Sequence, residues 1–154
     1  LKDGKGRRHW IPGTPNPTDL LDYIAAGGPI EAWNIPFEFY IWNFVGVRKL
    51  GWPPLQLEQC FCAMAKSRRY SMPGALGNAA KALGTADKLS GGKNLIQKLT
   101  RPHTPTKKRP AIRWTPATAW DDFVAFYDYN GQDVAAEDHA AALLPDLNAS
   151  TPCV

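Results

Sequence analysis

The sequence predicts a helix-rich α/β or α+β domain, and three observations support this fold class. The length of 154 residues suits one domain. Short apolar runs bounded by proline or glycine predict two strands near the N-terminus, and later segments carry apolar residues at helical spacing. Because so few strands precede so many helices, we expect that strands of the sheet are missing from this sequence.

Two strands and one helix are expected first. Residues 6–11 predict a short strand, and residues 29–33 predict a second one. Asn16 is the expected N-cap of a helix between them, with Pro17 in the first helical position. This helix should end at Gly27-Gly28, because glycine readily adopts the left-handed conformation of a helix end.

Helices are expected through the middle of the chain. Residues 36–49 are apolar nearly all round, which predicts a helix buried in the domain. Helical spacing of apolar residues predicts further helices around residues 57–64, 76–83 and 93–99.

The last third combines a long loop with two predicted helices. Four prolines within residues 101–116 exclude a regular element there, and a loop of this length is typically functional or disordered. Thr118 and Asp121 predict a helix start. Gly131 should weaken that helix, and a last helix is expected through Leu144.

The formal net charge of +4 conceals an uneven distribution. Between residues 88 and 120 there are eight Lys or Arg and no acid, whereas residues 121–154 hold seven acids and no Lys or Arg. This pattern suits a protein that holds a polyanion beside a divalent metal. It equally suits two adjacent solvated faces.

Several classes of protein are excluded. Residues 35–47, the most apolar run, are too short and too polar to span a membrane, and residues 1–5 do not resemble a signal peptide. Three cysteines do not form a disulfide framework, and Cys60-Phe61-Cys62 is too closely spaced for a zinc knuckle. We therefore expect the cysteines to be small buried side chains in a reducing cytosol.

The first of three chemically suggestive patterns is Asn34-Ile35-Pro36-Phe37-Glu38, at an expected strand-to-helix junction. Such junctions point backbone N–H groups and a cap side chain towards a ligand. An acid among aromatic neighbours, such as Glu38, costs free energy unless it is paired or bound to a cation. The alternative is that Glu38 is a solvent-facing acid in the first turn of the helix, where the helix dipole favours a negative charge.

The other two patterns lie further along the chain. Tyr129-Asn130-Gly131-Gln132-Asp133 puts a phenol and a carboxylate on one helical face, which could hold a metal or could be a surface acid beside a core tyrosine. The third pattern is the basic loop at residues 101–116, which suits the phosphates and bases of single-stranded nucleic acid, although a flexible solvated loop has the same composition. Its candidate nucleic-acid-binding residues are Lys107, Lys108, Arg109, Arg113 and Trp114.

Four motifs follow one another along the chain. They are Ala32-Trp33-Asn34-x-x-Phe37-Glu38, Gly51-Trp52-Pro53, Met72-Pro73-Gly74-Ala75-Leu76 and Tyr129-x-x-x-Asp133-Val134-Ala135-Ala136-Glu137. In this order, they resemble the 3′–5′ proofreading exonuclease domain of phage-type family A DNA polymerases. The first resembles the second exonuclease motif of that superfamily, and the last resembles its third motif in the tyrosine variant. The resemblance implies a ribonuclease-H-like α/β exonuclease domain over residues 1–147, followed by a tail at residues 148–154.

The same resemblance implies a two-metal site that uses Mg²⁺ or Mn²⁺. Asp133 would bind the metal that activates the attacking water, and Tyr129 would orient that water. Glu38, where the family usually has Asp, would serve the second metal. Asn34 and Phe37 would help to hold the 3′-terminal nucleotide of single-stranded DNA, and two cations about 4 Å apart would assist hydrolysis.

The sequence departs from the family at the first motif, because no D-x-E occurs in it. In the family that motif supplies two of the four metal-binding carboxylates. We therefore expect a domain that lacks its first strand or strands, binds metal weakly and works with a polymerase domain or a complementing chain, in the cytoplasm of a bacterial host if it is phage-encoded. The alternatives are a non-catalytic module that binds single-stranded DNA, an RNase D-like RNA 3′ exonuclease, and a fragment without a ligand.

Overall fold

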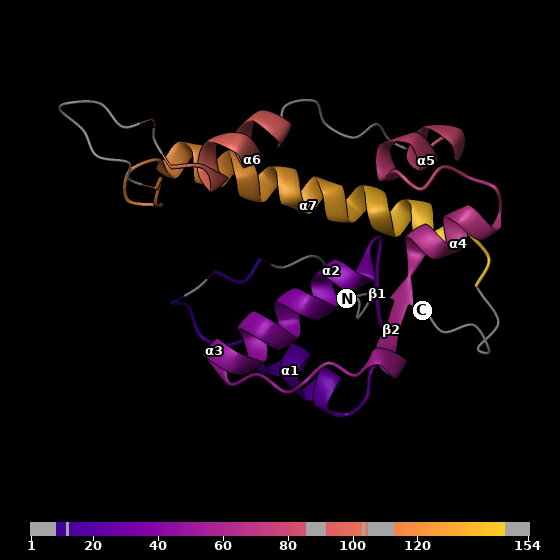
Figure 1. The fold of residues 1–154 in the computed structure, drawn as a ribbon, viewed down its shortest axis with the longest axis horizontal. Helices are drawn as coiled ribbons and strands as arrows, with labels where there is room; N and C mark the ends of the chain where they lie inside the picture. Colours follow the sequence, from indigo (N-terminus) through magenta and orange to yellow (C-terminus); the bar gives the residue numbers. More distant parts are fainter. Residues whose placement is uncertain (1–8, 12, 86–91, 103, 105–112, 147–154) are drawn as a thin grey trace. The chain divides into compact units, whose positions relative to one another are not determined.

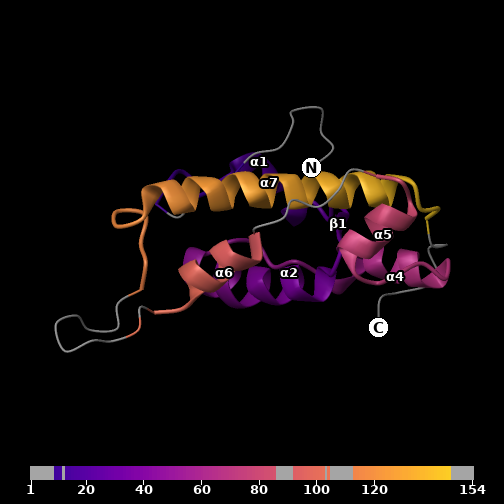
Figure 2. The same ribbon diagram turned by 90° about the horizontal axis from the view of Figure 1, so that it is seen from above.

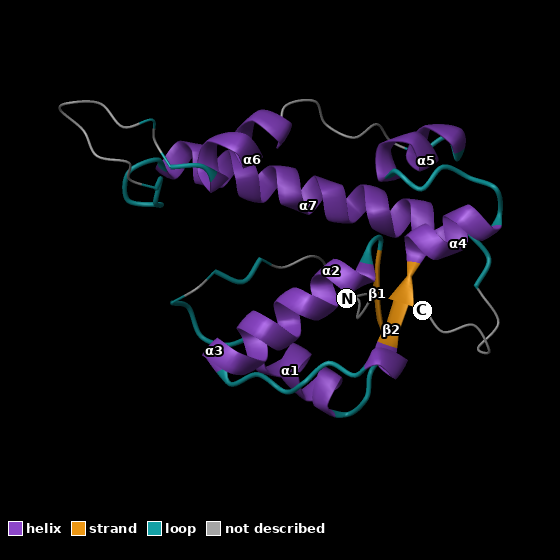
Figure 3. Ribbon diagram, in the orientation of Figure 1, coloured by secondary structure: helices purple, strands orange, loops and turns teal. Residues whose placement is uncertain are grey.

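The computed structural model describes residues 9–11, 13–85, 92–102, 104 and 113–146, which form a mixed α/β structure rich in helix (Figures 1 and 3). The chain divides into two compact units. The strand unit comprises Trp10–Asp87 and Ala136–Val154, and the helical unit comprises Leu1–His9 and Lys88–Ala135. The expected helix-rich α/β class is confirmed, while the expected tail at residues 148–154 lies outside the described residues.

Two parallel strands form the sheet of the strand unit. They are β1 (Ile30–Ala32) and β2 (Cys60–Cys62), paired from Ile30 with Cys60 to Ala32 with Cys62. Parallel strands need a crossover connection, which α2 (Ile35–Ile41), the π-helix η1 (Trp42–Val47), α3 (Arg48–Leu50) and the 3₁₀ turn η2 (Leu57–Gln59) provide here. The strand expected at residues 29–33 is confirmed.

The single helix expected at residues 57–64 is wrong. A 3₁₀ turn, β2 and the start of α4 (Ala63–Arg69) occupy these positions. Cys60 and Cys62 are buried and Phe61 between them is exposed, as the alternation of a strand requires. Pairing with β1 decides the conformation of this short apolar run, and periodicity within the run cannot show such a partner.

Two apolar clusters hold the strand unit together. One packs α1 (Thr18–Ala25) and the two strands around Ile24 and Ile35. The other joins α4, α5 (Leu76–Ala82) and the last turns of α7 (Trp120–Ala142) through Ala63, Ala79 and Ala140. Figure 2 shows α4 and α5 beside that end of α7. Alanine at these contacts lets the helices approach closely.

Two expectations about element boundaries need correction, and a third is confirmed. Residues 9–11 are not in a strand, because Ile11 begins a turn in which its carbonyl accepts a hydrogen bond from Thr14 N. The N-cap of α1 is Pro17 rather than Asn16, whose side-chain oxygen instead accepts a hydrogen bond from Trp52 Nε1 at 3.2 Å. The helix ends as expected, with Gly27 in the left-handed region (φ 84°).

The helical unit contains α6 (Gly92–Thr100) and most of α7. Lys98 Nζ on α6 lies 2.6 Å from Asp122 Oδ2 on α7. The expected break at Gly131 is wrong, since α7 continues through it, and the ~1 kcal/mol that glycine costs inside a helix is too small to interrupt a helix anchored by packing. The described part of residues 101–116 forms no regular element.

A buried lysine is the main electrostatic feature of the strand unit. Lys66 on α4 is 5 % exposed, and its ammonium lies 2.5 Å from a carboxylate oxygen of Glu31 and 2.5 Å from one of Asp146. Burial lowers the pKa of Lys66, but hydrogen bonds from the ammonium to the two carboxylates, together with their charges, outweigh it, so the pKa is raised above its ordinary value. The lysine thereby ties β1 to the segment that follows α7.

No helix within the described part of the chain is both long enough and apolar enough to cross a membrane.

Candidate functional site

The first motif lies where the parallel strands end. Trp33 and Asn34 follow β1, Met64 is near the end of β2, and Met64 N donates a hydrogen bond of 3.0 Å to the Trp33 carbonyl. In open α/β sheets, ligands bind outside the carboxyl ends of the strands. Asn34 is exposed at this edge, and its side chain makes no capping hydrogen bond to α2.

Phe37 and Glu38 lie in the first turn of α2. Phe37 is 62 % exposed, and the side chain of Glu38 is exposed as well. Partial desolvation raises the pKa of Glu38, and a hydrogen bond from its own backbone N–H opposes this shift. The apolar enclosure of Glu38 expected from its neighbours is therefore only partial, and solvent reaches the carboxylate.

Trp33 joins three of the four motifs. Its backbone N–H donates a hydrogen bond to Glu137 Oε1 in the last motif, and its indole N–H donates to the Gly74 carbonyl at 2.8 Å in the third. Glu137 is the last residue of the fourth motif, and the sequence pattern assigns it no role. The acid accepts from the residue that precedes Asn34, so it supports the strand-to-helix junction.

The remaining motif, Gly51-Trp52-Pro53, serves the helix that follows the junction. The indole of Trp52 packs on Gly46, where an added Cβ would lie 2.7 Å from ring carbon Cε3. Trp42 lies 4.7 Å from Trp52 between ring centroids, and its indole N–H donates a hydrogen bond of 2.7 Å to the Pro53 carbonyl. The motif therefore fixes η1 against the rest of the strand unit.

Tyr129 and Asp133 are four residues apart in α7, on one helical face as predicted. Tyr129 is buried, and its ring lies directly against Gly92 at the start of α6, where a Cβ would overlap ring atoms Cδ2, Cε2 and Cζ. Asp133 is half-buried. The glycine at residue 92 is thus what allows the ring its position, a relation the sequence pattern did not indicate.

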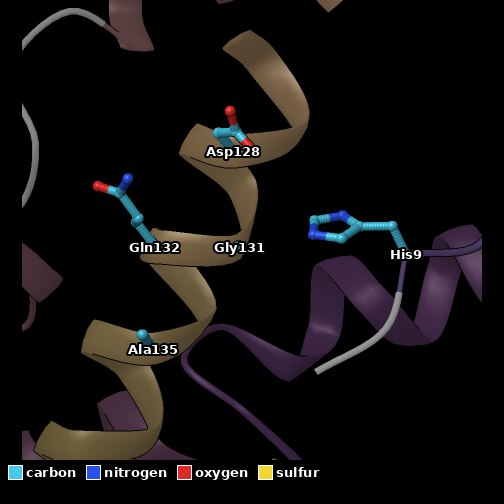
Figure 4. A pocket seen from close by; sticks show the side chains of 5 residues that line it. All are labelled: His9, Asp128, Gly131, Gln132 and Ala135. Carbon is cyan, nitrogen blue, oxygen red and sulfur yellow. The ribbon is translucent and has the colours of Figure 1, made fainter. Parts of the chain in front are cut away.

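The next face of α7 borders an open hollow in the helical unit, lined by His9, Asp128, Gly131, Gln132 and Ala135 (Figure 4). The imidazole of His9 points towards Gly131, where an added Cβ would lie 3.1 Å from Nε2. No sequence pattern indicates this hollow, because it depends on where His9 meets the helix.

The basic loop is described only in part. Arg113 is exposed and Trp114 is half-buried, with Lys98 Nζ 5.2 Å from the centroid of the Trp114 ring. Lys107, Lys108 and Arg109 lie outside the described residues.

The candidate residues are divided between the two units. Asn34, Phe37 and Glu38 lie in the strand unit, whereas Tyr129 and Asp133 lie in the helical unit. Carboxylate oxygens are suitable donors for Mg²⁺ or Mn²⁺, but two carboxylates do not make the donor set of a two-ion centre. Among the described residues, no three His, Cys, Asp or Glu side chains gather into a group that could hold a metal ion.

Comparison with protein-family models, curated proteins and solved structures finds no match to this chain.

Proposed function

We propose that this chain belongs to a 3′–5′ exonuclease domain of a phage-type family A DNA polymerase, which edits DNA 3′ ends during replication. The observation that carries the proposal is the order of the four motifs along the sequence. Further support comes from Trp33, since hydrogen bonds from this single residue reach two of the other motifs.

The position of the first motif supports a nucleotide-binding role. Asn34 and Phe37 are exposed at the carboxyl edge of the parallel strands, where an amide and an aromatic ring can hold a terminal nucleotide. Tyr129 and Asp133 share one face of α7, so that the phenol can orient a water beside the carboxylate.

The proposed exonuclease needs metal-binding carboxylates that the missing D-x-E motif would have supplied. Glu38 and Asp133 alone cannot neutralise two divalent cations, so the proposal requires further carboxylates in place of the D-x-E pair. Their source would be a further segment of a polymerase or a complementing chain.

The test is to restore the acids. A D-x-E strand is grafted onto the N-terminus, and 5′-labelled single-stranded DNA is incubated with the folded graft and Mg²⁺. We expect stepwise shortening from the 3′ end that Asp133→Asn and Glu38→Gln abolish and Tyr129→Phe slows. Asp138→Asn, which removes an exposed acid from the same helix, is the matched control. A folded graft that does not degrade DNA in a metal-dependent manner would refute the catalytic assignment.

The absence of D-x-E favours a second candidate, a module that binds single-stranded DNA without cleaving it. Replacing Lys107, Lys108 and Arg109 together by Ala should then weaken DNA binding, and an unchanged affinity would count against it. Competition between DNA and RNA of equal sequence separates both candidates from an RNA exonuclease.

A further inference from the structure

An exposed row of side chains runs along the helix that follows the first motif. Phe37, Tyr40, Phe44 and Arg48 lie on α2, η1 and α3, and we call them the aromatic stripe. The helix expected over residues 36–49 is present, but the expectation that it is buried is wrong. Tyr40 is 58 % exposed and Phe44 is 47 % exposed.

Three members of the stripe, Tyr40, Phe44 and Arg48, are stacked on one another. The rings of Tyr40 and Phe44 lie 6.0 Å apart between centroids at an interplanar angle of 28°, and Arg48 Cζ lies 4.4 Å from the centroid of Phe44. The π-helix η1 explains this alignment, because its turn is wider than that of an α-helix and brings residues four apart more nearly above one another.

The opposite face of the same helix already makes the packing contacts of the strand unit. Trp42 and Gly46 pack against Trp52, and the side chain of Asn43 bonds both the N–H and the carbonyl of Leu55 at 3.2 Å and 3.1 Å. The stripe lies on the solvent side of the helix, and of its rings Tyr40 also meets Phe39 edge-on at 5.8 Å between centroids.

The charge of this segment is suited to a polyanion. Between residues 39 and 57 the sequence has two cations, Arg48 and Lys49, and no acid. A guanidinium stacked on a ring keeps its N–H groups directed outward, so Arg48 can contact Phe44 and a phosphate together. Rings for bases combined with cations for phosphates are the usual surface for single-stranded nucleic acid.

We propose that the aromatic stripe is a track for single-stranded DNA that leads away from Asn34 and Phe37. This inference rests on the proposed function for its polarity: the 3′ end lies at Glu38, and the upstream nucleotides stack on Tyr40 and Phe44 towards Arg48. The stripe is at most about 16 Å long, the value for an α-helix at 1.5 Å per residue, which accommodates about four nucleotides at a rise of about 3.4 Å.

The test measures binding of fluorescein-labelled octathymidylate (dT8) by anisotropy with the full chain in EDTA, so that no cleavage occurs. We expect Tyr40→Ser and Phe44→Ser each to weaken binding about fivefold or more, the lower end of what base stacking contributes per ring. An octamer of abasic sites should bind both variants and the wild type alike, because it has no bases to stack. The matched control is Leu57→Ser, which removes an exposed apolar side chain away from the stripe.

Arg48→Ala tests the proposed contact between the guanidinium and a phosphate of the DNA. It should weaken binding of both octamers and lower the slope of log affinity against log salt by about 0.7, the value for one phosphate contact on a single strand. Lys81→Ala, which removes an exposed cation on α5, should change neither. Urea unfolding midpoints equal to that of the wild type would show that the variants are folded.

Three results would overturn the proposal. The first is that the wild type does not bind dT8, and the second is that the stripe variants bind dT8 as tightly as the wild type. The third is a dimer that Tyr40→Ser dissociates while dT8 binding is unchanged, because the stripe would then be a self-association surface. Failure of the proposed function gives a different result: the grafted enzyme does not degrade DNA, yet the stripe variants still lose dT8 affinity.

Discussion

Lys66 offers a sharp test of how the strand unit is stabilised, because burial is very unequal among the three charged groups. The lysine side chain is 7 % exposed, whereas its partners Glu31 and Asp146 are 35 % and 89 % exposed. Removing the lysine leaves two carboxylates that water can reach. Removing both acids leaves a buried ammonium without its partners.

The expected free energies of unfolding follow from this asymmetry. Lys66→Met keeps the hydrocarbon stem and loses two largely solvent-screened pairs, so we expect a loss of about 1 kcal/mol, near the upper end for exposed ion pairs. Glu31→Ala combined with Asp146→Ala strands a buried charge, which typically costs about 3 kcal/mol or more. The triple variant should be nearly as stable as Lys66→Met alone, because it no longer contains the charge.

The dependence on pH provides a second readout. The folded-state pKa of Lys66 is raised above the unfolded value of about 10.4. The stabilisation is therefore complete below that pH and is lost as pH rises through the folded-state pKa. The wild type should lose stability at high pH relative to Lys66→Met, and the double alanine variant should move closer to the wild type.

Urea unfolding at pH 7 and at several higher pH values measures these differences, since urea does not screen charges as guanidinium does. A double alanine variant as stable as Lys66→Met at pH 7 would refute the reasoning, because the ammonium would then not need its partners.

Two further predictions concern contacts at the candidate site. Glu137→Ala leaves the Trp33 N–H without its acceptor and should lower the free energy of unfolding by about 1–3 kcal/mol. Glu137→Gln keeps an acceptor oxygen and should retain most of that stability. Urea unfolding measures both variants, and equal losses would contradict the role of the acceptor oxygen. Gly92→Ala places a methyl group into the ring of Tyr129 and should cost about 1–3 kcal/mol by thermal unfolding. The same substitution in a Tyr129→Ala background should be nearly neutral, and an undiminished cost there would show that the two residues do not meet.

Local patterns predicted much of the fold. The strand at residues 29–33 and the helices around residues 76–83 and 93–99 agree with the structure, because each carries its signal within its own residues. Residues 57–64 did not, because their conformation depends on pairing with β1, thirty positions earlier along the chain. Gly131 was expected to weaken its helix, but packing further along α7 outweighs the preference of one residue.

The candidate site was predictable only as far as single residues and short spacings reach. Asn34 at the strand end and the Tyr129–Asp133 pair on one face follow from such spacings. The roles of Glu137 and Gly92 do not, because each depends on a partner from another element. The exposure of Tyr40 and Phe44 also escaped, since an all-round apolar helix gives no indication of which face the tryptophans will cover.

The π-helix lets its segment hold one residue more than an α-helix would need for the same rotation. Deleting a single residue such as Val45 from Trp42–Val47 would let the segment return to α-helical hydrogen bonding and would leave the turns on either side nearly in their present phase. Arg48 would then follow Phe44 by three positions instead of four, a spacing that still places both side chains on one side of a helix. The length of this segment could therefore change by one residue with little effect on the orientation of the helix beyond it.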